Sequence, residues 1–340
     1  MKFDKVLFLQ QNALGDVVLS TGVIKAFREQ FPYSHIAFLV SPETADLMDL
    51  SFVDEVVPYT KGMPMLPVIR RLWHYDAAIC LDFKYRSAVV PFLARIPVRA
   101  GIAHKRKLFL THAVERHPDS EKMYFTEHLV NVIERAVGLR LTQDPTHLYV
   151  AEATVTDKND VDAVLESRKE DCIRIAVAPF SSTRIKDWPI EYYKAFMEKL
   201  NKLTKVEFIL LGDSGDAEKE FWVSNYVIDL RGRMKLTATA ETLRRVDYFV
   251  GGCSAPLHIA TAVGCPALAL YGPSSSAKWA PQHKCICLEH RQPCNPCDRI
   301  GYGTYCKGNN VCMQQITVDE AIAAMQELWK RYPANKFAEK

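Results

Sequence analysis

VGGCSAPLHIATAVGCPALALYGP, residues 250–273, has the pattern of a strand end, a glycine turn, a short helix and a second strand. Ser254 suits the N-cap of that helix, Pro256 is tolerated in its first turn, and Gly264 marks its end. The N-terminus of such a helix offers unpaired N–H groups and partial positive charge, which suit a phosphate. We therefore expect an anion site here, with His258 pointing at the bound group.

Composition places the chain among ordinary globular proteins. Its 340 residues favour two domains, and 48% hydrophobic residues are enough for a real core. There is no run of eighteen apolar residues, and the first apolar stretch is too short for a signal peptide, so we expect a cytoplasmic protein. A formal net charge of +3 and the lack of a recognition motif argue against a nucleic-acid partner.

Segments with strand-like and helix-like patterns alternate along most of the chain. The expected strands are 6–10, 35–40, 55–59, 77–82, 174–178, 206–211, 227–229, 248–250 and 266–271. The expected helices are 16–30, 43–50, 63–72, 86–94, 125–138, 190–203, 217–224, 239–245 and 317–331. This alternation is typical of a doubly wound α/β fold. No internal repeat is visible.

Basic residues are concentrated in the first half. Residues 61–110 contain ten Lys or Arg and two acidic residues. This excess predicts contact with an anionic ligand or surface, and the alternative is solvated charge spread over the protein.

Three loops that follow expected strands carry candidate chemistry. In residues 12–16, NALGD, Asp16 can act as a general base, or it can merely favour the helix N-terminus electrostatically. Residues 179–189 place Ser181, Ser182 and Lys186 before a helix, as a phosphate requires, although a polar capped loop has the same pattern. In residues 210–218, Asp216 can bind ribose hydroxyls, or it can belong to an ordinary turn. The first loop has no GxGxxG, which argues against a dinucleotide site.

Cysteines gather near the C-terminus, where six of the ten lie between residues 285 and 312. Four of them, Cys294, Cys297, Cys306 and Cys312, resemble a four-thiolate site for a structural zinc or iron ion. The alternative is a set of free or redox-labile thiols.

Taken in order, these motifs resemble glycosyltransferase family 9, the heptosyltransferases. The resemblance rests on Asn-x-x-Gly-Asp from Asn12, Ser-Ser-x-x-x-Lys-x-Trp-Pro from Ser181, and Gly-x-x-Ser-x-x-x-His-x-Ala-x-x-x-Gly-x-Pro from Gly251. It covers residues 4–325. It implies an α/β fold of the GT-B type, with two Rossmann-like doubly wound domains facing a central cleft. Residues 1–160 are then the acceptor-binding domain, residues 170–316 the nucleotide-sugar-binding domain, and residues 317–333 a C-terminal helix packing toward the N-terminal domain.

The resemblance also implies roles for individual residues. Asp16 corresponds to the catalytic base. The donor-binding positions are Ser181, Ser182 and Lys186 at the diphosphate, Asp216 (or Glu218) at the ribose, Met234 at the adenine, and Cys253, Ser254 and His258 at the phosphate-binding helix. Family members usually have an aspartate where this chain has Cys253, and a thiol cannot accept two hydrogen bonds as a carboxylate does. Either the donor sugar differs from heptose, or another residue contacts its hydroxyls.

The resemblance thus implies a metal-independent, inverting transferase that moves a sugar, heptose in known family members, from an ADP-sugar to the inner core of lipopolysaccharide. We expect Lys84, Arg86, Lys105 and Arg106 to bind an anionic glycolipid acceptor. That acceptor predicts peripheral contact with the inner face of the inner membrane. Two alternatives are a GT-B-fold sugar-nucleotide epimerase or hydrolase, and a non-catalytic module that binds nucleotide or glycan.

Overall fold

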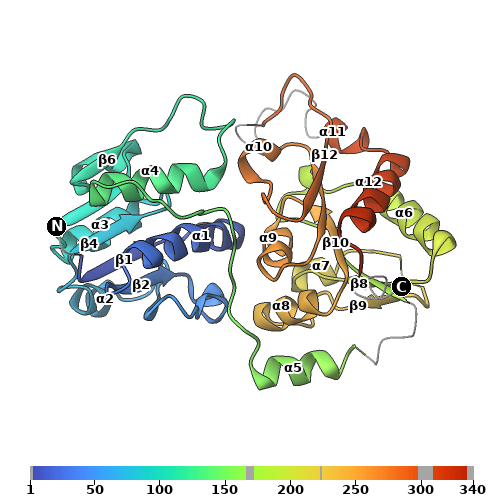
Figure 1. The fold of residues 1–340 in the computed structure, drawn as a ribbon, viewed down its shortest axis with the longest axis horizontal. Coiled ribbons are helices and arrows are strands. Elements are labelled where there is room, and N and C mark those ends of the chain that lie inside the picture. Colours follow the sequence, from blue (N-terminus) through green and yellow to red (C-terminus); the bar gives the residue numbers. More distant parts are fainter. Residues whose placement is uncertain (1–2, 166–171, 223, 298–308, 335–340) are drawn as a thin grey trace. The chain divides into compact units, whose positions relative to one another are not determined.

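Two six-stranded parallel sheets, each covered by helices, form the protein (Figure 1). The computed structural model describes residues 3–165, 172–222, 224–297 and 309–334. The chain divides into two compact units, Met1–Ala151 and Glu152–Lys340. This confirms the predicted α/β class with two doubly wound sheets. The division falls before α5 (Val155–Asp162), which belongs to the second unit.

The first unit has the strand order β3-β2-β1-β4-β5-β6. Its strands are β1 (Lys5–Leu9), β2 (His35–Val40), β3 (Glu55–Pro58), β4 (Ala77–Cys80), β5 (Val98–Ile102) and β6 (His112–Val114). Its helices are α1 (Leu14–Gln30), α2 (Met65–Arg71), α3 (Tyr85–Leu93) and α4 (Phe125–Val137), with 3-10 turns η1 (Pro42–Thr44), η2 (Asp46–Met48) and η3 (His104–Phe109). The chain leaves β1 toward β2 but leaves β4 toward β5, so the order reverses between the neighbours β1 and β4. Folds of this type bind ligands at such a reversal, outside the carboxyl ends of the strands.

Successive side chains of β1 point to opposite faces of this sheet, as the two-residue period of a strand requires. Leu7 and Leu9 lie in a hydrophobic core that includes Val68 of α2 and Val90 of α3. On the other face Phe8 meets Phe27 of α1 edge to face, with ring centroids 5.2 Å apart, and α1 contacts α4.

The second unit repeats this arrangement with the order β12-β11-β10-β7-β8-β9. Its strands are β7 (Ile173–Ala178), β8 (Val206–Leu210), β9 (Val227–Asp229), β10 (Tyr248–Gly252), β11 (Ala267–Tyr271) and β12 (Cys285–Glu289). Besides α5, its helical segments are η4 (Arg184–Lys186), α6 (Ile190–Leu203), α7 (Ser214–Ala217), α8 (Leu236–Arg244), α9 (Ala255–Ala262), α10 (Ser276–Trp279), α11 (Val311–Gln314) and α12 (Val318–Arg331). Here the order reverses between β7 and β10.

The C-terminal helix α12 belongs to the core of the second unit. A capping box of Thr317 and Glu320 starts it, and Met325 and Leu328 pack with Phe196 of α6 under the sheet. Its buried face therefore lies within the second unit, and the expected packing toward the N-terminal domain stays a prediction.

The other differences from the sequence-based elements are local. The expected helix at 43–50 is the pair of 3-10 turns η1 and η2, and the one expected at 217–224 is the single turn α7 at Ser214–Ala217. Gly251 and Gly252 extend β10 rather than forming a turn. Strands β5, β6 and β12 were not predicted. Among the described helices, none has the length and hydropathy needed to cross a membrane.

Candidate active site

Asp16 lies just beyond the carboxyl end of β1, in the first turn of α1. Its backbone N–H donates to the Ala13 carbonyl at 3.0 Å, and the side chain is half-buried. The structure thus places Asp16 at the reversal between β1 and β4, where a ligand of the first unit would bind. A carboxylate in the first turn also favours the helix dipole, so both interpretations from the sequence fit this position.

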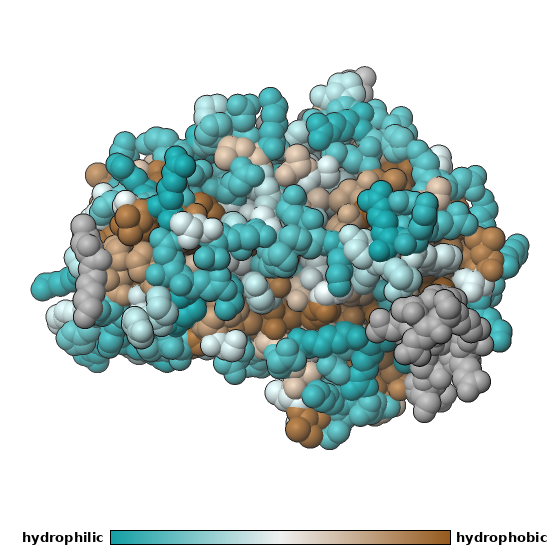
Figure 2. All heavy atoms as spheres, in the orientation of Figure 1, coloured by the Kyte–Doolittle hydropathy of each residue, from teal (hydrophilic) through white to brown (hydrophobic). Residues whose placement is uncertain are grey.

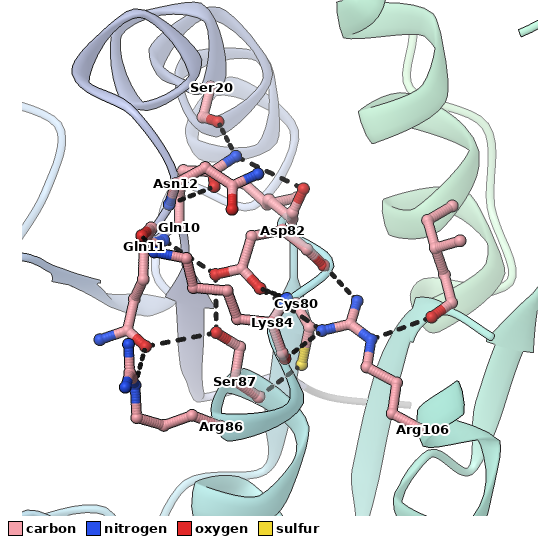
Figure 3. A network of polar contacts seen from close by, with 12 residues as sticks. Gln10, Gln11, Asn12, Ser20, Cys80, Asp82, Lys84, Arg86, Ser87 and Arg106 are labelled. Carbon is pink, nitrogen blue, oxygen red and sulfur yellow. Dashed lines mark hydrogen bonds and ion pairs between the residues drawn. The ribbon is translucent and has the colours of Figure 1, made fainter. Parts of the chain in front are cut away.

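A buried polar network holds the loop before Asp16 (Figure 3). At its centre the fully buried Asp82 carboxylate accepts hydrogen bonds from the Gln11 N–H at 2.8 Å, the Ser87 hydroxyl at 2.6 Å and the Lys84 N–H at 2.8 Å. The Gln10 side chain also holds this loop, because its Oε1 accepts a hydrogen bond from the Asn12 N–H at 3.2 Å. These bonds join the ends of β1 and β4, so the network positions residues 12–16.

Arg106 closes the same network from inside. Its guanidinium is 1% exposed, pairs with Asp82 at 3.4 Å, and donates to the carbonyls of Ile102 at 3.0 Å and Lys84 at 2.9 Å. Removing one partner of a buried ion pair typically costs about 3–5 kcal/mol. This guanidinium has no surface left for an acceptor, in contrast to the role predicted from the sequence.

The other three predicted acceptor residues remain near the surface. Lys84 is exposed and its ammonium donates to the Gln11 carbonyl. Arg86 is half-buried and donates to Gln11 Oε1 at 3.1 Å, and Lys105 is exposed on η3. They follow β4 and β5, so all three lie at the edge of the sheet that also carries Asp16.

In the second unit the predicted donor residues follow neighbouring strands. Ser254 is the N-cap of α9, as predicted, directly after β10. Its hydroxyl lies 3.4 Å from the Gly252 carbonyl and makes no capping bond to the helix. Pro256 lies in the first turn and has no N–H, which leaves the N–H groups of Ala255 and Leu257 directed out of the helix end. These groups suit an anion.

Lys186 and His258 lie near this helix end, close enough for the Lys186 charge to act on the imidazole. Lys186 ends η4 in the loop after β7, and in the described part of the chain no carboxylate forms an ion pair with it. His258 is 3% exposed, and its Nδ1 has no hydrogen-bond partner among the described residues. Burial, and then the nearby Lys186 charge, lower the pKa of His258 to about 4. The site therefore offers one cation and one neutral imidazole.

Close backbone contact brings the Lys186 loop to β10. A Cβ atom on Gly252 would lie 3.2 Å from the Lys186 carbonyl oxygen, and one on Gly251 would lie 3.0 Å from the Ala178 carbonyl oxygen. These glycines are therefore needed for the approach of neighbouring backbone and not for a turn.

Asp187 fixes the conformation of the same loop. Its carboxylate accepts from the Ser181 N–H and hydroxyl, both at 2.8 Å, and burial raises its pKa. The next residue, Trp188, is 1% exposed and donates its Nε1–H to the Ile316 carbonyl at 2.8 Å. The Ser181 hydroxyl thus serves the loop itself, whereas Ser182 is exposed.

The remaining donor positions differ in their surroundings. The Asp216 carboxylate accepts from the Asp213 N–H at 3.2 Å and pairs with Lys219 at 2.7 Å, which makes it part of the α7 capping box. Met234 is half-buried just before α8. Cys253 lies between β10 and α9 beside the Tyr271 hydroxyl, whose pKa is raised well above its ordinary value by burial and then by neighbouring thiols including Cys253.

The segment that carries Cys294 and Cys297, which we call the cysteine loop, contacts the turn at Gly272 and Pro273 that follows β11. The Cys297 N–H donates to the Pro273 carbonyl at 2.8 Å, and the buried Cys312 thiol lies 3.0 Å from where a Cβ atom on Gly272 would be. Cys294 is half-buried in the same loop as Cys297. Cys306 lies outside the described residues, so the four-thiolate site stays a prediction. The three described cysteines have the soft donors that zinc and iron prefer, but they are not among the described side chains whose ligand atoms gather within 4.8 Å of one another.

Sequence reasoning missed the two positioning carboxylates, Asp82 and Asp187. Asp82 directly follows the apolar segment of β4, and Asp187 lies beside Lys186. A polar residue at the carboxyl end of a buried strand was the available signal for Asp82.

Comparison with known proteins identifies the class. The fold is that of GT-B glycosyltransferases. It matches the solved structure of a family 9 glycosyl transferase from Veillonella parvula with a TM-score of 0.81 and 20% identity over 97% of this chain and 99% of that one. It matches the Escherichia coli ADP-heptose lipopolysaccharide heptosyltransferase II with a TM-score of 0.79 and 20% identity over 97% and 100%. An iron-containing dodecameric glycosyltransferase, TibC of enterotoxigenic E. coli, matches with a TM-score of 0.63 and 12% identity over 97% and 77%.

Sequence comparison gives the family. Residues 68–302 match the profile of glycosyltransferase family 9 (heptosyltransferase). The lipopolysaccharide core heptosyltransferase OpsX of Haemophilus influenzae is 22% identical over 94% of this chain and 95% of its own length. The chain belongs to glycosyltransferase family 9, as its motifs predicted.

Proposed function

We propose that this protein transfers heptose, with inversion, from ADP-heptose to an inner-core lipopolysaccharide acceptor. The observation that carries the proposal is the meeting of three groups at the carboxyl edge of the second sheet: the uncapped start of α9, the Lys186 ammonium and the neutral His258. Together they offer N–H donors and one positive charge for a diphosphate. The names of relatives that act with ADP-heptose or on lipopolysaccharide support the choice of donor and acceptor.

In this mechanism Asp16 takes the proton from the acceptor hydroxyl as that oxygen attacks the anomeric carbon. The bond from that carbon to the ADP oxygen breaks on the opposite face, which inverts the configuration. The α9 N–H groups and Lys186 stabilise the negative charge that develops on the departing diphosphate. Lys84, Arg86 and Lys105 provide positive charge for the acceptor. No step in this scheme uses a metal ion.

Cys253 bears on the choice of sugar. Its thiol is held beside the Tyr271 hydroxyl and offers weaker hydrogen bonding than a carboxylate. The sugar hydroxyls are therefore bound here by other groups. Cys253→Asp should change the preference among ADP-sugars while leaving ADP affinity similar.

We also propose that Cys294, Cys297 and Cys312, with Cys306, hold a structural zinc or iron ion. The similarity to TibC, a glycosyltransferase that contains iron, supports a metal in this chain. Such an ion would tie the cysteine loop to the turn at Gly272. Elemental analysis of the purified protein tests this, and Cys297→Ser should lower both the bound metal and the melting temperature. Full-length protein without bound zinc or iron would contradict it.

A thermal-shift screen of ADP-, GDP-, UDP- and CMP-sugars tests the donor class directly, because a ligand that binds the folded state raises the melting temperature. We expect ADP-sugars to give the largest shift. A larger shift with UDP-sugars would contradict the proposal. Donor turnover without any acceptor would instead favour an epimerase or hydrolase, and tight donor binding without release of ADP on an acceptor panel would favour a non-catalytic module.

A further inference from the structure

The first unit exposes large hydrophobic side chains that the transfer site does not use. They lie on α2, α3 and η3, where α3 contacts both of the other elements. The exposed members are Leu66, Tyr85, Phe92, Leu93 and Leu108, and Leu108 is 93% exposed. Hydrophobic areas are also visible among hydrophilic ones in the face that Figure 2 shows. We call the surface formed by α2, α3 and η3 the α2–α3–η3 surface.

Three aromatic rings of this surface pack against one another. The Phe109 ring meets Tyr85 with centroids 5.1 Å apart and Phe92 with centroids 5.2 Å apart. The Arg99 guanidinium lies over the Phe92 ring at 5.5 Å. The residues of α3 that reach solvent are aromatic, aliphatic or arginine, whereas a helix facing water normally presents polar groups there. Clustered exposure of this kind marks an interaction surface.

The charges on this surface are mostly positive, and the two acids that flank it, Glu55 and Glu115, pair with Arg71 of α2 and Lys107 of η3. Residues 56–114 contain only two carboxylates, of which Asp82 is fully buried and Asp76 is half-buried and accepts hydrogen bonds from two backbone N–H groups. The exposed cations there include Arg70, Arg95 and Lys105, for which no ion pair is present among the described residues. Lys107 pairs with the exposed Glu115 at 3.3 Å, a type of contact that contributes little.

We propose that the α2–α3–η3 surface docks on a lipid bilayer with anionic headgroups. Leu93, Leu108 and the aromatic rings would enter the interfacial layer, and the arginines and lysines would lie at the level of the lipid phosphates. Hydrophobic burial and attraction to anionic lipid both contribute to such binding, and each cation near the bilayer strengthens it.

A bilayer fits this surface better than a second copy of the chain. A symmetric dimer would place the same patch against itself, and so would bring Arg95 and Lys105 toward like charges. An anionic bilayer supplies negative charge and hydrocarbon together. The surface shares Arg86 and Lys105 with the proposed acceptor site. Leu108 and Arg95 lie outside that site, so variants of these two residues test the inference without donor or acceptor.

Flotation of the full chain with vesicles provides the test. We expect binding to vesicles of phosphatidylcholine and phosphatidylglycerol, weak binding to phosphatidylcholine alone, and release at high salt because salt screens exposed charges. Leu108→Glu and Arg95→Glu should each lower the partition coefficient about tenfold. The matched controls are Leu139→Glu and Arg135→Glu, which change exposed residues on and after α4, on the other face of the sheet, and should bind like the wild type.

Three results would overturn the inference. The wild type could stay unbound with anionic vesicles, the controls could lose binding as much as the surface variants, or the wild type could form an oligomer that Leu108→Glu dissolves. An assay of sugar transfer to a water-soluble, delipidated acceptor distinguishes failure of membrane binding from failure of the proposed function. Leu108→Glu should retain that activity even if vesicle binding is absent.

Discussion

A buried polar network holds the loop that carries Asp16 at the end of β1, and the Asp16 side chain is not one of the groups that form this network. Gln11, Asp82 and Arg106 connect the neighbouring strand ends, so Asp16→Asn should preserve the fold. A general base typically contributes about 10²- to 10⁴-fold to a rate. We therefore expect transfer to fall by that order while ADP affinity, measured by calorimetry, stays within about threefold. Asp49→Asn, at an exposed site, serves as the control, and normal turnover of Asp16→Asn would remove Asp16 from the mechanism.

Lys186 supplies positive charge next to the start of α9. Hydrogen bonds to charged groups typically contribute about 1.5–3 kcal/mol, which corresponds to roughly 10- to 100-fold in affinity. Lys186→Ala should weaken ADP binding by that amount in a calorimetric titration. Lys202→Ala, at the far end of α6, should have no effect. Equal ADP affinities for wild type and Lys186→Ala would exclude this role.

His258 makes stability depend on pH. Burial lowers its pKa in the folded protein to about 4, against 6.5 ordinarily. The unfolded chain thus binds a proton at higher pH, and the free energy of unfolding falls as the pH drops from about 6.5 to about 4, by up to roughly 3 kcal/mol. His258→Gln should remove this part of the pH dependence in urea unfolding at about pH 7 and about pH 4.5. An unchanged pH dependence would show that another group is responsible.

At the residue scale, the sequence located the groups whose position follows from local pattern. Ser254 and Lys186 could be placed because each follows a strand and precedes a helix. The buried state of Arg106 could not, because it depends on Asp82, which lies 24 residues earlier and comes close only through the pairing of β4 with β5. The ion pair between Asp216 and Lys219 was likewise not predictable from the sequence.

At the scale of elements, Gly252 sets how closely the Lys186 loop approaches β10. A methyl group there would lie 3.2 Å from the Lys186 carbonyl oxygen, so the loop must shift. Overpacking typically costs about 1–3 kcal/mol, and a loss of about tenfold in ADP affinity corresponds to the lower part of that range. Gly252→Ala should show this loss by calorimetry while far-UV circular dichroism remains that of the wild type. Unaltered ADP affinity would mean that the loop position does not control the site.

The strands that were not predicted have weak hydrophobic patterns. The inner strand β5 is mostly buried, but Arg99 and Gly101 interrupt its apolar residues. Strands β6 and β12 end their sheets and have no fully buried residue. Without a buried face, a strand lacks the continuous hydrophobic pattern that marks central strands such as β7 and β11. The central strands other than β5, and the helices packed on them, were predictable for that reason.

At the scale of the whole molecule, one topology occurs twice without a visible sequence repeat. In each unit the third, second and first strands are followed across the sheet by the fourth, fifth and sixth. This order requires only buried strands, crossover helices and loops at the carboxyl edge, which many sequences satisfy. The sequence could therefore predict two doubly wound units and the edges on which their sites lie, although it showed no similarity between them.

The most direct test of the central claim is a transfer assay with purified protein, ADP-heptose and an inner-core acceptor lacking heptose, followed by mass spectrometry. The account predicts one heptose added per acceptor, an equal amount of ADP released, and formation of both products slowed about 10²- to 10⁴-fold with Asp16→Asn. Release of ADP at the same rate without acceptor, or no heptosylated product under conditions in which ADP-heptose binds, would contradict it.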